Sequence, residues 1–457
     1  MQTKRVPASD EVADWNAKYL WHPMVDPNVV REHAPLIIER GEGCFISDID
    51  GNRYLDCTAG LWNVNVGHRR PEVIAAILEQ LNAIEYYGTF ANMANVPSIR
   101  LSKRLIDMLA PEKMRRVMFS SGGSDSTETA FKLARQYWKL SGKPEKTKMF
   151  SLKLGYHGVH FGGMSASGNT MWRRAYEPLM PGFFQIEAPY LYRNPWTDDP
   201  EQLATIVAEQ LDRDIQYQGA DTVAAFIAEP VQGVGGVIVP PASLWKKFRE
   251  VCDRHDVLLI SDEIVTGFGR TGAMFGARGW GVAPDVMCLA KGINSGYIPL
   301  GATVVNERVA NAWDKPQALT GIMHGYTYSG HPVACAAALA CLDIVEDEDL
   351  PGNAGRVGAH FLRRLEELRV YDCVGDVRGK GLMLGVELVR DKKTKAPFAP
   401  ADAYPAKLYE AMLAQKVMVR VAAGKVILSP PLVFTEAYVD EAMAALHSAF
   451  QSVKPAT

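Results

Sequence analysis

One lysine stands where an apolar segment of the chain ends. The stretch DVMCLAKGINSGYIPLGATVV, residues 285–305, starts like a strand that enters the interior, reaches Lys291 and continues as a glycine-rich segment. A lysine at a strand end is usually solvated and inert. A lysine amine held among apolar groups, by contrast, can attack a carbonyl carbon. The neighbouring motifs decide between these two interpretations.

Two carboxylates end another apolar segment. In LLISDEIVTG, Asp262 and Glu263 follow a strand pattern, and a buried carboxylate costs several kcal/mol unless a positive group meets it. One interpretation is a salt bridge to an arginine such as Arg270. The other is a carboxylate that holds a protonated ring nitrogen or a metal. No clustered ligands support a metal, and His157 and His160 in YHGVH are equally well explained as loop residues.

A glycine-rich segment, SSGGSDSTE at 120–128, lies between an apolar run and a helical pattern. Glycines let backbone N–H groups approach an anion, Ser124 adds a hydroxyl, and the helix start adds a positive dipole end. The G-K-[ST] of a nucleotide P-loop is absent, so a triphosphate with magnesium is not expected. The alternative is a simple capped helix, with Asp125 as the cap and Glu128 three residues later.

A further motif, GFGRTG at 267–272, matches a dinucleotide-binding fingerprint, which requires a helix to open at its third glycine. Here the sequence continues AMFGARGWGVAPD, and its glycines and proline disfavour a long helix. A nicotinamide-dependent dehydrogenase is therefore the less favoured alternative.

Alternating strands and helices must position these motifs. Apolar runs separated by helical patterns predict a mostly parallel central sheet with helices on both faces. Such sheets bind ligands at the C-terminal ends of their strands, which places the loops after Ser121, Glu229, Asp262 and Lys291 on one rim. The predicted strands are 116–121, 148–153, 223–230, 257–265, 285–292 and 301–307, and the predicted helices are 128–140, 200–215 and 243–256.

The strand ends thus combine an anion cradle, acids and a lysine. Pyridoxal phosphate (PLP) requires these groups: a lysine forms a Schiff base, an acid keeps the pyridine nitrogen protonated, and a helix start holds the phosphate. A non-catalytic binding protein is a further alternative, in which Lys291 would have no chemical role. The occurrence of Lys291, Asp262 and the glycine-rich loop together disfavours this alternative.

The remaining segments predict a smaller α+β domain built from both termini. A small β-meander is expected within the first 70 residues. Strands are expected within 375–389 and 417–433, and helices after Pro332 and at 403–416 and 435–450. We divide the chain into an N-terminal segment of the small domain (1–70), a large PLP-binding domain (71–325) and the C-terminal small domain (326–457).

Composition excludes several classes. The chain has 457 residues, 47% hydrophobic and 22% charged, with a net charge of −3 and no basic stripe, so nucleic acid is not an expected partner. Neither the start, MQTKRVPASDEVADW, nor any other stretch predicts a secretory signal or a membrane helix. The seven cysteines form no C-x-x-C pair and are interpreted as reduced thiols of a cytoplasmic protein.

Three segments, LISDEIVTGFGRTG, APDVMCLAKGINSGYIPLGA and HGYTYSGHPVACAAALA, resemble the class III (omega) aminotransferases, PLP enzymes of fold type I. The resemblance extends from DIDGNRYLDCTAGLWNVNVGH to VILSPPLV and points to the amine:pyruvate branch. It implies a large α/β domain, a small α+β domain and a homodimer with active sites shared across the interface, with a tetramer left open.

The resemblance implies a role for each cofactor contact. Lys291 resembles the Schiff-base lysine, which also moves the proton, and Asp262 the partner of the pyridine nitrogen. Ile264 and Tyr156 resemble the residues on the two faces of the ring. Glu229, in EPVQG, matches an acid near the cofactor.

The phosphate contacts are implied in the same way. Gly123 and Ser124 match the phosphate loop, and Thr327 of GYTYSGHP would reach the phosphate of the neighbouring subunit. The sequence departs from the family pattern Ser-Gly-Ser/Thr-Glu at Gly122 and Asp125, so one hydroxyl is missing and the phosphate is expected to be held more loosely or by backbone groups.

On the substrate side, Trp62 and Phe90 resemble an aromatic pocket, to which Tyr156 also contributes. Arg420 in VMVRVAAGK resembles the arginine that binds a keto-acid carboxylate, the alternative being an exposed strand arginine. Ala91 and Val234 differ from many relatives and are expected to alter the pocket walls.

These features predict an aminotransferase that takes an amino group from a primary amine or ω-amino acid and gives it to a keto acid, expected to be pyruvate, by a ping-pong mechanism. The partners are therefore small molecules. A decarboxylase or aminomutase on the same scaffold is the alternative.

Overall fold

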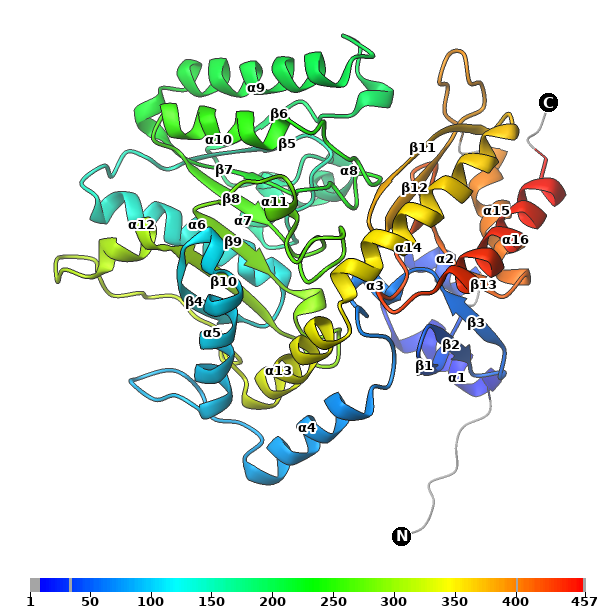
Figure 1. The fold of residues 1–457 in the computed structure, drawn as a ribbon, viewed down its shortest axis with the longest axis horizontal. Helices are drawn as coiled ribbons and strands as arrows, with labels where there is room; N and C mark the ends of the chain where they lie inside the picture. Colours follow the sequence, from blue (N-terminus) through cyan, green and yellow to red (C-terminus); the bar gives the residue numbers. More distant parts are fainter. Residues whose placement is uncertain (1–8, 33–34, 400–401, 455–457) are drawn as a thin grey trace.

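The computed structural model describes residues 9–32, 35–399 and 402–454, so the first eight residues of the stretch examined for a signal lie outside the described chain. A large part built on one central sheet lies beside a smaller part that joins both ends of the chain (Figure 1). The sheet order is β4-β10-β9-β8-β7-β5-β6. Its strands are β4 (Met114–Ser120), β5 (Lys148–Leu152), β6 (Phe183–Ile186), β7 (Val223–Ala228), β8 (Leu258–Asp262), β9 (Val286–Leu289) and β10 (Gly301–Asn306).

The predicted mostly parallel sheet is confirmed, with one exception. The strands β6, β5, β7, β8 and β9 pair in parallel. β10 is antiparallel to both β4 and β9. The apolar pattern of 301–307 predicts a buried strand but carries no information on direction, because strands buried on both faces have the same composition in either orientation.

Helices cover both faces of the sheet, as alternation along β7 illustrates. Phe226 faces α9 (Pro200–Tyr217) and α10 (Leu244–Arg254), and its ring lies 4.7 Å from that of Phe248. Ile227 faces the opposite way and packs with residues of α6 (Gly123–Leu140). Successive side chains of a strand point to opposite faces, so a strand apolar at every position needs two helical layers.

The smaller part contains two four-stranded sheets. In one, the meander β1 (Ile38–Glu42), β2 (Phe45–Asp48) and β3 (Arg53–Asp56) is extended by β13 (Val417–Met418), which pairs in parallel with β3. The other has the order β11-β12-β15-β14. Its strands are β11 (Val374–Lys380), β12 (Met383–Leu388), β14 (Arg420–Ala422) and β15 (Lys425–Leu428), and α14 (Leu350–Leu365), α15 (Tyr404–Ala414) and α16 (Glu436–Ser452) accompany them.

One long helix, α13 (Pro332–Asp347), runs from the large part toward the small one (Figure 1). It packs against α4 (Pro71–Ala83) and α5 (Val96–Met108). Because β13 pairs with β3, segments near both ends of the chain share one sheet, as the sequence analysis expected for the small domain. The domain boundaries after residues 70 and 325 stay predictions.

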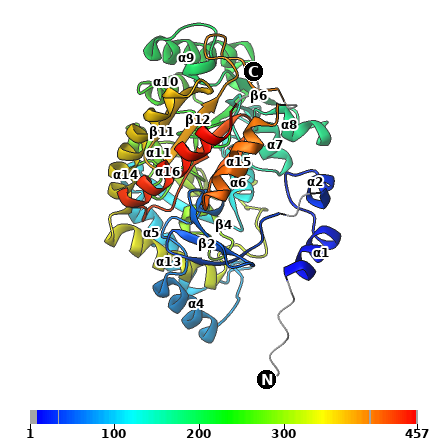
Figure 2. The ribbon, with the colours of Figure 1, turned by 90° about the vertical axis from the view of Figure 1, so that its right-hand side faces the viewer.

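The N-terminal segment contains helices that the sequence analysis did not predict. α1 (Ser9–Tyr19) and α2 (Pro27–Glu32) lie at the margin of the molecule (Figure 2), and α1 has no buried residue. Shorter helices are α3 (Ala59–Trp62), α7 (Phe161–Ala166), α8 (Thr170–Arg173), α11 (Gly276–Gly279) and α12 (Glu307–Ala310). Across the described ranges, no helix has the length and apolar character needed to cross a membrane.

The GFGRTG segment forms turns, and the next helix after it is the single turn α11. The structural context that a dinucleotide site requires, a helix opening at the third glycine, does not occur at this place in the chain.

Candidate active site

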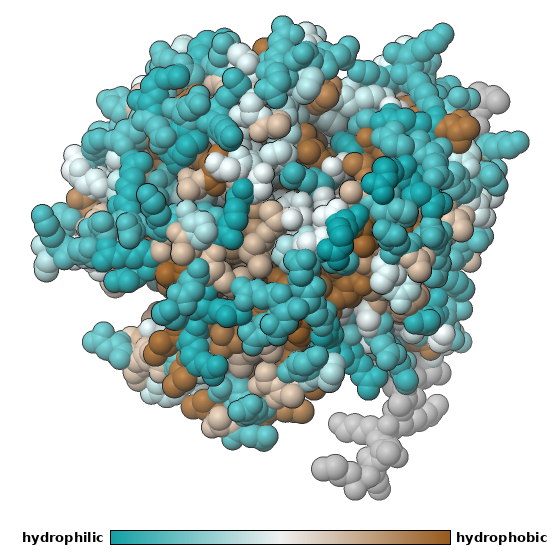
Figure 3. All heavy atoms as spheres, viewed as in Figure 1, coloured by the Kyte–Doolittle hydropathy of each residue, from teal (hydrophilic) through white to brown (hydrophobic). Residues whose placement is uncertain are grey.

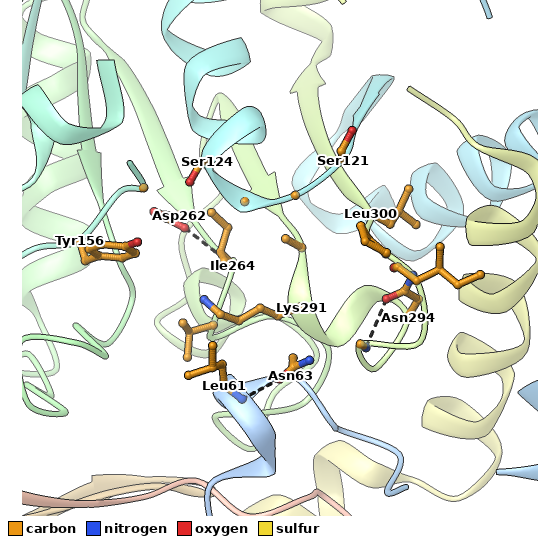
Figure 4. A pocket seen from close by; sticks show the side chains of 18 of the residues that line it. Leu61, Asn63, Ser121, Ser124, Tyr156, Asp262, Ile264, Lys291, Asn294 and Leu300 are labelled. Atoms are coloured by element: carbon orange, nitrogen blue, oxygen red, sulfur yellow. Dashed lines mark hydrogen bonds between the residues drawn. The ribbon is translucent and has the colours of Figure 1, made fainter. Parts of the chain in front are cut away.

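The ends of four strands meet at one cavity of about 380 Å³. Ser121, Glu229 and Lys291 line it from the loops after β4, β7 and β9, and Asp262 lines it from the last position of β8. Figure 4 shows Ser121, Asp262 and Lys291 around the cavity. The predicted rim is therefore confirmed. It forms because parallel strands end on the same edge of the sheet, and β4, although it pairs with the antiparallel β10, runs in the same direction as β9.

Lys291 lies two residues after the end of β9, at the start of a short 3-10 turn, Lys291–Ile293. Its φ of +46° lies in the left-handed region, which is uncommon for a residue with a side chain. The side chain extends into the cavity on the side of Tyr156 (Figure 4). Burial lowers the pKa of the Lys291 ammonium, and the carboxylates of Asp262 and Glu229 act in the opposite direction. The amine is thus neutral at lower pH than an exposed lysine.

Asp262 is paired with a histidine. Its Oδ2 lies 2.8 Å from Nδ1 of His157, and its Oδ1 accepts the Ile264 N–H at 3.2 Å. His157 is almost fully buried, and no described residue bonds its Nε2. His157 lies in a loop, as one of the two interpretations expected, but its contact with Asp262 was not predicted. YHGVH offered no signal for this contact beyond its place next to Tyr156, because the pairing joins residues 105 positions apart.

Arg270 does not pair with either acid, so the salt-bridge interpretation was wrong. The buried guanidinium of Arg270 donates to the carbonyls of Leu382 and Pro430 and to Oδ1 of Asn65 at 2.8 Å. Glu263 instead accepts the N–H groups of Gly276 and Ala277, each at 2.8 Å, together with the hydroxyls of Ser261 and Thr266. Glu263 therefore fixes the turn after β8, and Arg270 joins this turn to the small part.

The glycine-rich segment forms the start of α6, with Gly123 as its first residue. A Cβ at Gly123 would lie 2.9 Å from Cδ1 of Ile264, so only glycine lets the helix start come this close to Ile264. Ser124 also lines the cavity, and its Oγ accepts the Val159 N–H at 3.1 Å. The first N–H groups of a helix have no partner within it, which makes this end suited to an anion.

Asp125 is not the residue before the helix, as the capped-helix interpretation expected. It is the third residue of α6, and its carboxylate accepts the upstream Ser121 N–H at 2.9 Å and contacts Nε2 of His160 at 2.7 Å. Glu128 accepts the Gly162 N–H rather than one at the helix start. These contacts secure the loop around the helix start from outside the cavity.

Glu229 is buried beside the cavity. Its carboxylate accepts the N–H groups of Tyr156 at 3.0 Å and Gly233 at 2.9 Å. Burial raises the pKa of Glu229 to about 7, and the nearby Asp262 adds to this rise. Tyr156 lines the cavity and packs edge to face against Trp172, with 5.2 Å between ring centroids.

The predicted substrate residues lie in different places. Trp62 is buried against Gly233 and does not line the Lys291 cavity, whereas its neighbours Leu61 and Asn63 do. The chain around them is unusual, with positive φ at Gly60 and Trp62. The role predicted for Trp62 stays a prediction, and Leu61 and Asn63 are lining residues that the sequence analysis missed, as is Asn294 in the turn after Lys291.

Phe90 and Thr327 border a separate cavity of about 490 Å³. The Tyr86 hydroxyl donates to the Thr327 carbonyl at 2.6 Å, so the two segments lie together. Neither residue lines the cavity of Lys291. Ala91, next to Phe90, and Val234 do not line the Lys291 cavity. Within one chain, neither of these two differences from the family pattern alters the walls of that cavity.

Arg420, on β14, is partly buried. Burial lowers the pKa of its guanidinium, and it lies close enough to Tyr156 and Lys291 to influence the pKa of each. The alternative of an exposed strand arginine was wrong.

Comparison with known proteins identifies the class. The chain matches the family Aminotransferase class-III over residues 28–450, and it belongs to this family. It is therefore an aminotransferase with the fold of PLP enzymes of type I, and its cofactor is pyridoxal phosphate.

Several relatives cover nearly the whole chain. A putrescine–pyruvate aminotransferase of Pseudomonas aeruginosa is 38% identical over 432 residues, 94% of each protein. An amine transaminase from an uncultivated Pseudomonas species, solved in its PLP-bound (internal aldimine) form, is 53% identical with a TM-score of 0.94, covering 95% of this chain and 99% of the other. An (S)-enantioselective omega-transaminase from Thermomicrobium roseum is 41% identical with a TM-score of 0.95, covering 98% and 100%.

The cavity fits this cofactor. It combines a buried amine, a carboxylate held by a histidine, and a helix start whose glycine leaves backbone N–H groups open to an anion. These are the three groups that a PLP site requires.

Proposed function

We propose that this protein transfers an amino group from a primary amine or ω-amino acid to a keto acid, pyruvate, in two half-reactions of a ping-pong mechanism. The observation that carries the proposal is the convergence of Lys291, Asp262 and the start of α6 on one cavity. The names of the relatives support the substrates, since one is a putrescine–pyruvate aminotransferase and others are amine transaminases.

Lys291 is the residue that binds the cofactor covalently and moves the proton. Bound PLP supplies an electron-withdrawing ring that acidifies the Cα of the substrate amine. Burial lowers the pKa of Lys291, so a neutral Nζ is available as nucleophile and base. Nζ of Lys291 would accept the Cα proton in one half-reaction and return a proton in the other.

Asp262 pairs with the protonated pyridine nitrogen. The His157 imidazole at 2.8 Å and the Ile264 N–H hold its carboxylate in place, so little reorganisation accompanies charge changes nearby. Glu229, which Tyr156 and Gly233 hold through their N–H groups, is the second acid beside the cofactor.

The remaining contacts orient the ring and phosphate. Ile264 and Tyr156 would hold the ring of the cofactor between them, and Gly123 and Ser124 would bind its phosphate at the start of α6, where the helix dipole favours negative charge. Thr327 reaches the phosphate bound to the partner subunit.

Arg420 binds the carboxylate of the keto acid, and its place near Tyr156 and Lys291 supports this role. Tyr156, with Trp62 and Phe90, supplies the aromatic part of the substrate site. Trp62 itself is buried against Gly233, while Leu61 and Asn63, its neighbours in the chain, line the cavity.

The protein acts as a homodimer in the cytoplasm, and a tetramer of two such dimers is compatible with this. Figure 3 shows apolar side chains gathered on the lower part of the face on which α4, α5 and α13 lie. Exposed apolar residues of α4 and α5 include Leu78, Leu81 and Ile99. Phe90 and Thr327, remote from the Lys291 cavity of their own chain, would serve that of the partner. The seven buried, unpaired cysteines support a reducing compartment.

A half-reaction experiment tests the proposal. The holoenzyme is mixed with a panel of amines, and loss of the bound cofactor's absorbance is followed, then its return on addition of pyruvate. We expect loss with amines, return with pyruvate, and no release of CO2. Turnover without a keto acid, or stoichiometric CO2, would instead favour the decarboxylase or aminomutase alternative.

A further inference from the structure

The chain that follows β7 and Glu229 folds back on itself in a closed loop. Gln232 and Ile238 form a β-bridge, in which each N–H donates to the carbonyl of the other residue, at 3.1 and 2.9 Å. We call the residues from Gln232 to Ile238 the bridged loop. Inside it, the Gly233 carbonyl accepts the N–H groups of Gly236 at 2.9 Å and Val237 at 3.0 Å. The position of Gly233 is therefore coupled to the tip of the loop.

Gly233 contacts two residues that the sequence analysis assigned to the active site. Its N–H donates to Oε2 of Glu229 at 2.9 Å and is one of the two backbone N–H groups that hold this carboxylate. Its Cα faces Trp62, because a Cβ at Gly233 would lie only 2.3 Å from Cζ3 of the Trp62 ring. Such a close approach of backbone to a ring requires glycine. A displacement of Gly233 would therefore change the surroundings of Glu229 and Trp62 together.

Arg378, on β11 of the small part, holds the tip of the bridged loop. Its Nε donates to the carbonyls of Gly236 at 3.0 Å and Val237 at 3.1 Å, and its Nη2 donates to the Gly236 carbonyl at 2.6 Å. The rigid, planar guanidinium can bind two successive carbonyls in one orientation. Within the described ranges, no hydrogen bond or ion pair joins Arg378 to Glu229, so Arg378 can orient Glu229 only through the loop.

Two carboxylates fix the Arg378 guanidinium itself. Nη1 donates to Oδ2 of Asp376 at 2.9 Å, and Nη2 donates to Oε2 of Glu387 at 2.8 Å. Glu387 is almost fully buried, and although burial by itself raises its pKa, the cations of Arg378 and Lys425 lower the pKa of Glu387 overall. Glu387 also accepts Nε of Arg193 at 2.7 Å. Charged partners therefore direct the remaining Arg378 donors toward the loop.

We propose that Arg378 is a positioning residue for the reaction: it holds the bridged loop so that the Gly233 N–H keeps Glu229 in place beside the cofactor. The inference rests on the proposed function, in which Glu229 is the second acid beside the cofactor. Arg378 does not line the Lys291 cavity. Because the loop belongs to the large part and Arg378 to the small part, the placement of one part against the other determines the orientation of Glu229.

The kinetics of Arg378→Met and Glu229→Gln, singly and combined, test this route. Arg378→Met should lower kcat, at saturating amine and pyruvate, by about tenfold, because the Glu229 carboxylate loses one hydrogen bond and its fixed orientation. In the Glu229→Gln background the same change should cost less than about twofold, since the group that Arg378 positions is already altered. Equal losses in the two backgrounds would overturn the inference.

Arg193→Met is the matched control. Arg193 shares the Glu387 carboxylate with Arg378, but its other donor bonds the Lys395 carbonyl, and none of its hydrogen bonds within the described ranges reaches the bridged loop. Arg193→Met should therefore leave kcat unchanged to within about twofold. Equal losses of kcat in Arg193→Met and Arg378→Met would show a general loss of docking between the two parts and would overturn the inference.

The KM for pyruvate distinguishes positioning from a general shift of the small sheet. Arg420, the residue proposed to bind the keto acid, lies on β14 of the same sheet as Arg378. A shift of the whole sheet would displace Arg420 and raise this KM. Arg378→Met should lower kcat without raising the KM for pyruvate, and a raised KM with unchanged kcat would contradict the positioning role.

The cofactor-free protein gives a readout that does not depend on turnover. Burial raises the pKa of Glu229 to about 7, although the N–H groups of Tyr156 and Gly233 act in the opposite direction. Loss of the Gly233 contact should raise this pKa further. The free energy of unfolding, relative to the same protein with Glu229→Gln, should therefore fall over a pH range that extends about one unit higher in Arg378→Met. Arg193→Met should retain the wild-type range.

The charged groups that face Glu229 stay the same in all of these proteins. Asp262 and His157 influence the pKa of Glu229, and Glu229 influences that of Lys291. The same pH range in wild type and Arg378→Met, or an equal extension in the Arg193→Met control, would overturn the inference. If Glu229→Gln leaves kcat unchanged in an otherwise wild-type protein, the proposed role of Glu229 fails, and the pH range of the cofactor-free proteins still decides whether Arg378 positions this carboxylate.

Discussion

Gly122 leaves space for a hydroxyl at the phosphate end of the cavity. It precedes α6, its φ of 176° is extended backbone that any residue adopts, and no atom lies within 4 Å of where its Cβ would stand. The neighbouring Gly123 is the opposite case, because Ile264 fills the space of its Cβ. The missing hydroxyl at position 122 is therefore not required by packing.

Gly122→Ser should bind PLP about tenfold more tightly, ~1.4 kcal/mol, because it adds one hydrogen bond to a charged group. The measurement is the PLP dissociation constant of the cofactor-free protein, followed by absorbance. Gly122→Ala adds the Cβ without the hydroxyl and is the matched control. The same affinity in both variants would show that position 122 does not reach the phosphate.

Glu229 makes stability depend on pH in a defined direction. Its pKa is raised from 4.5 to about 7 by burial, so between these values the folded protein keeps a proton that the unfolded chain loses. The contribution of Glu229 is fully present below pH 4.5 and is lost as pH rises through 7.

We therefore expect the free energy of unfolding of cofactor-free wild type, relative to Glu229→Gln, to fall by roughly 3 kcal/mol between pH 4.5 and 7. Urea unfolding of both proteins at several pH values measures this difference. The pH dependence that comes from the other carboxylates is the same in both proteins and cancels in the difference. A difference that stays constant, or that rises with pH, would contradict the assignment.

At the scale of elements, the turn after β8 determines where Asp262 points. Glu263 holds Gly276 and Ala277 through two N–H groups. Arg270 ties the same turn to carbonyls of Leu382 and Pro430. Burial lowers the pKa of Arg270 to about 9. Its Nη1 and Nη2 groups donate to neutral acceptors of the small part and not to a carboxylate.

Arg270→Met should lower the free energy of unfolding by about 2–4 kcal/mol, because three buried acceptors lose their donor. Denaturant unfolding measures the loss. The exposed Arg213→Met is the control and should change stability by less than about 0.5 kcal/mol. A loss at Arg270 no larger than at Arg213 would show that this link carries little of the stability.

The elements that could be predicted from sequence are those with strong local patterns. Fully apolar runs such as 223–228 and 258–262 predicted buried strands, and the rule that parallel strands end together placed Glu229, Asp262 and Lys291 on one rim. The reversed direction of β10 and the helix α1 were missed, because neither depends on a pattern visible in its own residues.

Contacts between distant segments could not be predicted. The pairing of His157 with Asp262 requires the order β5-β7-β8 of the sheet, and the link from Arg270 to Pro430 requires the docking of the small part. Leu61 lines the cavity instead of Trp62 because the backbone turns at Gly60 and Trp62. Two positive φ values on either side of one residue have no reliable sequence signal.

At the scale of the whole molecule, the account predicts a dimer whose active sites need both subunits. Light scattering should give twice the 50.3 kDa mass of one chain. Thr327→Ala should bind PLP about tenfold more weakly without changing this mass, since it removes one hydrogen bond to a charged group. Thr394→Ala, in an exposed turn, is the control. A monomer with full affinity for PLP would contradict the shared site.

The central claim is that Lys291 binds PLP covalently. The holoenzyme is reduced with borohydride and digested, and the peptides are analysed by mass spectrometry. We predict one pyridoxyl group per chain, on the peptide that contains Lys291, and none in the Lys291→Ala variant. A pyridoxyl group on another lysine, or undiminished labelling of the Lys291→Ala variant, would contradict the account.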